Sequence, residues 1–168
     1  AYERHCAWFA ALGPKRAVED ACADLANLVA ACRRAIASSK TQLAVDALQG
    51  AWAVLNLRGP FSTGLELAEA VCTLSERDSE IAAWAHAVLG SALDWLGRPI
   101  EARRSFEDAL SLARGRGDHA CEVKVLAGLA ALNDNEGRMS EARSGHSAAL
   151  VLSRQLGDAV AECAALNG

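Results

Sequence analysis

The sequence has little of what β-rich or disordered proteins need. Only 5% of its 168 residues are aromatic and 3 are proline. β-Branched residues are sparse whereas alanine and leucine dominate, so intrinsic propensity favours helix along most of the chain. With 52% hydrophobic and 23% charged residues, the composition is that of an ordered globular protein. We therefore expect an all-α fold with almost no strand.

Positive charge and long apolar runs are also scarce. The net charge of −4 gives no electrostatic reason to expect a polyanion partner, because phosphate binding needs clustered Lys and Arg. Apolar runs such as residues 129–132, and also the longest run at residues 6–12, fall far short of the roughly 20 residues that span a bilayer. No charged-then-apolar leader opens the chain. A soluble, cytoplasmic protein with neither a nucleic-acid nor a membrane partner is expected.

The cysteines lack the spacing of a disulfide or metal framework. None of the six forms a CxxC pair, and each lies in an apolar, helix-patterned run, which predicts reduced thiols in or near the core. They are Cys6, Cys22, Cys32, Cys72, Cys121 and Cys163. His119 and Cys121 suggest an isolated metal site, but two ligands without partners are too few, and Ala159 and Ala161 replace them where the local pattern recurs. No metal is expected.

The chain repeats itself with a period of 40 positions. The stretch GRPIEARRSFEDALSLARGRGD at 97–118 and the stretch GRMSEARSGHSAALVLSRQLGD at 137–158 are identical at 11 of 22 positions. Such self-similarity is the signature of a repeat architecture. The first copy contains an RGD tripeptide and a near match to a nucleotide-binding glycine loop. The repeat indicates instead that Gly117 ends one helix and Asp118 caps the next.

Periodicity and capping residues predict a series of helices. Pro99 suits a helix start, since its missing N–H costs nothing there, and Gly97 suits a helix end. Asp78, Asp118 and Asp158 recur as N-caps at the interval of the repeat. The predicted helices span about 2–12, 18–37, 41–57, 61–75, 79–96, 99–114, 120–136 and 139–155, and another begins at 158.

One continuous domain, 1–168, is expected from this pattern. It divides into N-terminal helices at 1–40, a degenerate repeat at 41–77, repeats at 78–117 and 118–157, and a truncated repeat at 158–168. Because the chain opens with Ala1 rather than Met and closes within a helical pattern, we expect a fragment of a larger protein.

The repeated positions resemble those of the tetratricopeptide repeat family. The matching residues are Leu89, Gly90, Leu93, Ala102, Phe106 and Ala109, and then Leu129, Ala130, Asn133, Ala142, His146 and Ala149. The resemblance implies antiparallel helix pairs stacked as a right-handed superhelix, an α-solenoid. The 40-residue spacing is similar to that of the long repeats behind the nucleotide-binding module of bacterial signal-transduction ATPases, or behind protein kinases. This implies the sensor or oligomerisation region of such a regulator, with self-association as a further expectation.

The expected function is protein binding without catalysis or a cofactor, because the sequence has no GxxxxGK[ST], HExxH, GxSxG or kinase signature. In the family, certain positions of the first helix of each pair line a concave face. By register these are Asp46, Gln49, Ala53, Asn56, Trp84, Ala87, Ser91, Asp94, Lys124, Ala127, Ala131 and Asp134. With Lys124 as its one cation, this face lacks the Lys and Asn cluster that clamps a carboxylate in some family members. It suits a peptide with an apolar side chain for Trp84 and a basic group for Asp94 or Asp134.

Two other functions stay open at this point. The inner groove would bind a small inducer, as repeat domains of some transcriptional activators do, or an enzyme site would form near the N-terminal helices from Glu3, His5 or Cys6. His5, His86 and His146 lie at predicted helical positions and are expected to pack rather than to catalyse. Trp8 and Trp52 are expected in the core.

Overall fold

The structure, a computed structural model, describes residues 2–11, 25–75, 81–157 and 162. These residues contain α-helices and no strand, which confirms the all-α prediction for this part of the chain. The helices are α1 (Tyr2–Ala11), α3 (Leu25–Ala37), α4 (Thr41–Arg58), α5 (Phe61–Leu74), α6 (Ala82–Trp95), α7 (Pro99–Arg116), α8 (His119–Asn135) and α9 (Met139–Leu156). The predicted caps Asp78 and Asp158, and residues 18–24 of the helix predicted over 18–37, lie outside the described residues.

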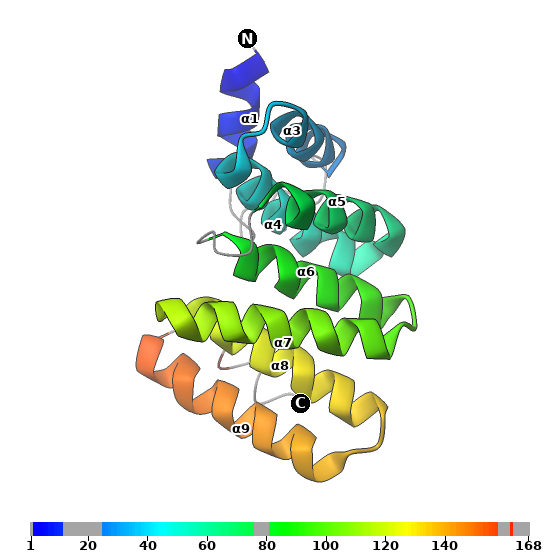
Figure 1. Ribbon diagram of the computed structural model, residues 1–168, viewed down its shortest axis with the longest axis vertical. Helices are drawn as coiled ribbons and strands as arrows, with labels where there is room; N and C mark the ends of the chain where they lie inside the picture. The colour runs from blue at the N-terminus through cyan, green and yellow to red at the C-terminus, as the bar shows by residue number, and fades with distance from the viewer. Residues whose placement is uncertain (1, 12–24, 76–80, 158–161, 163–168) are drawn as a thin grey trace.

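The helices follow one another along the long axis of the molecule, from α1 and α3 at one end to α8 and α9 at the other (Figure 1). From α3 onward each helix packs against the next, and α4 with α6 and α6 with α8 pack as well. None of the described helices is long and apolar enough to cross a membrane.

Glycines in the left-handed region end several helices. Gly97 has φ +71°, its N–H donates to the Asp94 carbonyl at 2.9 Å, and the Arg98 N–H donates to the Leu93 carbonyl at 2.9 Å. Residues 137 and 138 repeat this pair of bonds, as the sequence period predicts. The predicted end of α7 was too early: the helix continues through residue 115 and stops at residue 116, because Gly117 is the glycine with positive φ.

Asp118 caps α8 and also ties α8 to α6. One carboxylate oxygen accepts the Cys121 N–H at 3.0 Å, and the other accepts the Trp84 indole N–H at 2.9 Å. The first bond satisfies a backbone donor that the helix itself cannot satisfy. The RGD segment is therefore a helix end followed by a cap, and its aspartate is occupied within the protein.

Close packing between helices depends on small residues that face large ones. The Phe106 ring lies against Gly90 and Gly128, where a Cβ would stand 2.7 Å from the ring at either position. At the α4–α5 contact, Gly64 lies against Trp52 in the same way. A larger side chain at these three glycines would separate the helices, so at these contacts the sequence pairs a glycine with a large ring.

Of the two tryptophans predicted to lie in the core, one is buried and one is exposed. Trp52 is 2% exposed and confirms its core assignment, whereas Trp8 is 54% exposed and its assignment was wrong. The reason lies on α1, where the neighbouring Phe9 is buried. Successive residues of a helix point about 100° apart, so burial of Phe9 turns Trp8 toward solvent.

The described cysteines lie in or near the core, as predicted. Cys32 and Cys121 are buried and Cys72 is half-buried, and all three are free thiols. The side chain of Cys6, and residues Cys22 and Cys163, lie outside the described part of the chain.

An ion pair recurs with the sequence period. Arg114 near the end of α7 contacts Glu122 of α8 at 2.7 Å, and Arg154 near the end of α9 contacts Glu162 at 2.7 Å. In both pairs the glutamate lies eight positions after the arginine, and the second pair occupies the repeat equivalents of the first. The repeat therefore extends from sequence identity to the ion pair formed by an arginine near the end of α7 and of α9.

Candidate binding site

A hollow of about 510 Å³ lies where α4, α6, α7 and α8 meet. We call this hollow the groove. It is lined by Asn56, Ser91, Asp94, Trp95, Phe106, Lys124, Gly128, Ala131 and Asn135. Its lining combines aromatic rings, uncharged polar groups, one ammonium and one carboxylate.

The groove has a buried aromatic ring and an exposed one. Phe106 is only 2% exposed and is held between α6 and α8 by the two glycines it touches. Trp95 is 57% exposed, yet its indole N–H donates to the Asn56 side-chain oxygen at 2.7 Å. Its ring also stacks on Phe61, with centroids 4.9 Å apart and planes 9° apart. These contacts fix the Trp95 ring and leave a large part of its surface open.

One end of the groove carries a partly buried ammonium. Lys124 Nζ lies 5.6 Å from the centre of the Trp84 ring, within the range of a cation–π interaction. The Trp84 indole is itself fixed by Asp118. Burial lowers the pKa of Lys124. No carboxylate of the described residues lies within ion-pair distance of this ammonium.

The other end of the groove carries a half-buried carboxylate. Burial raises the pKa of Asp94, a hydrogen bond with the Asn135 side chain opposes that rise, and the charge of Glu136 adds to it. The Ser91 hydroxyl nearby donates to the Ala87 carbonyl at 3.0 Å, which leaves its oxygen lone pairs directed elsewhere.

Four of the eight residues predicted for peptide binding line the groove, and the other four do not. The four lining residues are Asn56, Ser91, Asp94 and Lys124. Trp84 does not line the groove but borders it through Lys124, whose ammonium lies over the Trp84 ring; the exposed aromatic ring of the groove is that of Trp95.

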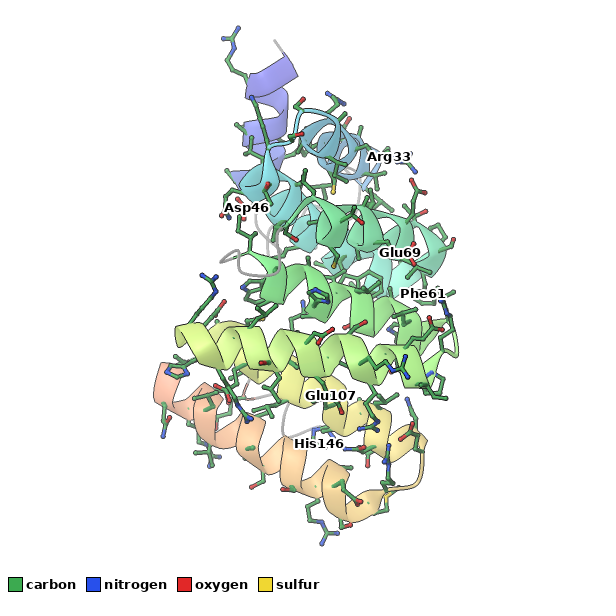
Figure 2. The ribbon with its side chains drawn as sticks, in the orientation of Figure 1. Arg33, Asp46, Phe61, Glu69, Glu107 and His146 are labelled. Carbon is green, nitrogen blue, oxygen red and sulfur yellow. The ribbon has the colours of Figure 1, made fainter. Side chains whose placement is uncertain are left out.

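Asp46, Gln49 and Asp134 lie away from the groove. Asp46 accepts a hydrogen bond from Gln42 of its own helix at 2.8 Å. In Figure 2, Asp46 and Phe61 lie on opposite sides of the molecule, and Phe61 is the residue against which Trp95 packs. Asp134 contacts His146 of α9 at 3.0 Å and so faces its partner helix. Of the other positions on the predicted face, Ala131 lines the groove, Ala87 is buried, and Ala53 and Ala127 do not line it.

Sequence reasoning missed Trp95, Phe106, Gly128 and Asn135. Trp95 and Asn135 are equivalent positions of the repeat and follow Asp94 and Asp134 directly, so a register shifted by one residue would have found both. Asn135 lies beside Asp94, at the end of the groove opposite Lys124.

The described residues contain no group of side chains that would form a metal site. No three His, Cys, Asp or Glu side chains gather there in a way that would hold a metal ion. His119 faces Glu122 at 3.5 Å, whereas Cys121 is buried, so the two do not share a site. The side chains of Glu3, His5 and Cys6 lie outside the described part of the chain, so the enzyme alternative built on them stays a prediction.

Comparison with known proteins identifies the fold and no family. No protein-family profile matches the chain, and no characterised protein matches it by sequence. Among solved structures it is similar to the crystal structure of BtubC (BKLC) from P. vanneervenii, with a TM-score of 0.62 and 16% identity. The match covers 95% of this chain and 76% of that one. The likeness is one of fold alone.

Proposed function

We propose that the chain is a non-catalytic protein-interaction scaffold of the tetratricopeptide type, and that its groove binds a peptide segment of a partner protein. In a larger bacterial regulator it would form the sensor or oligomerisation region. The single observation that carries the proposal is the groove itself, which joins an open aromatic wall, Trp95, to a half-buried carboxylate, Asp94.

Contacts between residues about one sequence period apart support a superhelix of repeats. The Trp95 indole binds Asn56, the Lys124 ammonium covers Trp84, and each contact joins equivalent ends of alternate helices. In a solenoid, each repeat contacts only its neighbours, and the alternate helices line an extended surface that is available for binding. The groove lies on this row of α4, α6 and α8.

The lining of the groove favours a peptide with an apolar and a basic side chain. An apolar side chain would cover the exposed surface of the Trp95 ring, and tryptophan is enriched among the residues that dominate binding energy at protein interfaces. A half-buried carboxylate whose pKa is raised by burial gains from a cationic partner. We therefore assign the basic side chain of the ligand to Asp94.

A selection experiment tests the proposal. A phage library of random dodecapeptides is selected on the immobilised protein, and the enriched peptides are titrated against Ala131→Trp, which fills the groove, and Ala148→Trp. Both alanines are exposed, but Ala148 lies on α9 outside the groove. We expect Ala131→Trp alone to abolish binding. Failure to enrich any peptide, or equal binding by both variants, would exclude the groove as a peptide site.

The volume of the groove also favours the small-ligand alternative. About 510 Å³ falls within the roughly 300–1,000 Å³ of small-molecule sites. A thermal-shift screen of metabolites distinguishes the two functions, because a specific ligand raises the melting temperature by mass action. A metabolite that stabilises the wild type but not Ala131→Trp would support the alternative.

A further inference from the structure

The ammonium of Lys124 has no counter-charge among the described residues. It is partly buried, it touches the face of the Trp84 ring, and the carboxylates of the described residues are all too far away to pair with it. The neighbouring carboxylate, Asp118, is already occupied by the Trp84 indole and the Cys121 N–H. A partly buried charge in this state is costly to the free protein and gains most from an anion supplied by a ligand.

The two charges of the groove lie at its opposite ends. Lys124 faces Trp84 near the start of α6, whereas Asn135 bonds Asp94 near the end of α6, so α6 and α8 run in the same direction. Lys124 and Asn135 are 11 positions apart on α8. At a rise of 1.5 Å per residue, this separation corresponds to about 16 Å along the groove. The Phe106 ring lies between them, packed against Gly128.

We propose that the peptide bound in the groove is bipolar and extended, with an internal acidic side chain on Lys124, a basic side chain on Asp94, and apolar side chains on the exposed Ala131 and Trp95. This inference rests on the proposed peptide-binding function and specifies its ligand. Because an extended chain advances about 3.3 Å per residue, the acidic and basic side chains are roughly five residues apart.

Charge complementarity gives this ligand its selectivity. A peptide with two basic ends would bring a cation against the uncompensated Lys124, and one with two acidic ends would bring a carboxylate against Asp94. Like charges at close range are costly in an interface, so both mismatched peptides are rejected. Chain direction matters less than the pairing of charges, since an extended peptide reversed in the groove still places acid on Lys124 and base on Asp94.

Three labelled peptides test the proposal by fluorescence anisotropy. They share one apolar centre with Glu and Lys, Lys and Lys, or Glu and Glu spaced about five residues apart, and both termini are blocked to remove their charges. We expect the wild type to bind the Glu and Lys peptide at least about tenfold more tightly than the others, a difference of about 1.4 kcal/mol. Lys124→Glu should reverse the preference toward the Lys and Lys peptide.

Arg143→Glu is the matched control, because it makes the same charge change on α9 outside the groove. It should leave all three affinities within about twofold. Lys124→Met provides a neutral variant in case the reversed charge prevents folding. It should bind the Glu and Lys peptide and the Lys and Lys peptide equally, and should still bind the Glu and Glu peptide more weakly. If Lys124→Glu or Lys124→Met keeps the wild-type preference, or if no peptide of the set binds, the bipolar ligand is wrong. Peptides from the phage selection that bind the groove without charge preference would leave the proposed function intact and remove only this inference.

Discussion

Phe106 of α7 packs so closely on Gly90 of α6 that a Cβ at residue 90 would lie 2.7 Å from the ring. Gly90→Ala should therefore destabilise the fold by about 1–3 kcal/mol, because the buried ring has to move. Gly115→Ala is the matched control: its Cβ would meet nothing within 4 Å, and helix propensity should stabilise that variant by about 0.5–1 kcal/mol. Urea unfolding measures both. If both substitutions change the free energy of unfolding by the same amount in the same direction, the close contact between Gly90 and Phe106 is contradicted.

Asp118 should contribute to stability through two hydrogen bonds. Asp118→Ala removes the cap of α8 and the partner of the Trp84 indole, and should cost about 1–2 kcal/mol. Asp118→Asn has a single side-chain oxygen and retains one of the two acceptors, so its loss should be intermediate. Urea unfolding at low and high salt distinguishes the bonds from a charge effect. If both variants have the same free energy of unfolding as the wild type, the hydrogen bonds of Asp118 do not stabilise the contact between α6 and α8.

Asp94 should make stability depend on pH. Burial raises its folded pKa above the ordinary value of 3.8, so its contribution is present at low pH and is lost as pH rises through the raised pKa. Asp94→Asn resembles the protonated form and avoids this loss. The stability of Asp94→Asn relative to wild type should therefore increase from pH 3 toward neutral pH and then level off. Urea unfolding across this range gives the difference, and a difference that falls with pH would contradict the assigned cause.

Cys32 and Cys121 should be unreactive in the folded protein. Burial raises the pKa of each thiol to about 12, and the thiolate is the reactive form. Iodoacetamide at pH 8 should leave both unlabelled over the time that labels a free cysteine, and should label both after unfolding in urea. Peptide mass spectrometry reports each site separately. Labelling of either residue in the folded protein at the rate of a free thiol would show that its helix opens readily.

Much of the fold follows from the sequence, because local signals determine it. Pro99 gives the start of α7, Gly117 and Asp118 give the boundary between α7 and α8, and the structure places the helix start, the helix end and the cap at these residues. Side-chain direction near a helix end is harder to predict, since a shift of one residue turns a side chain by about 100°. Asp134 was assigned to the groove for this reason, whereas its neighbour Asn135 lines it.

The rest of the site depends on contacts that no local pattern contains. The bond from Trp84 to Asp118 spans 34 positions, and it is what places Lys124 over the Trp84 ring. Phe106 was identified as a packing residue, but its place in the groove follows from the glycines on both neighbouring helices. Such contacts between different helices need the three-dimensional arrangement before they are visible.

The indole N–H resonances of the four tryptophans test the central claim most directly, because each reports a different region of the chain. The ¹⁵N-labelled protein is titrated with the blocked Glu and Lys peptide. Trp95, in the groove wall, and Trp84, beneath Lys124, should shift and saturate together, while the buried Trp52 and the distant Trp8 stay in place. If the Trp8 resonance shifts to saturation while the Trp84 and Trp95 resonances stay in place, the peptide binds elsewhere and the account is contradicted.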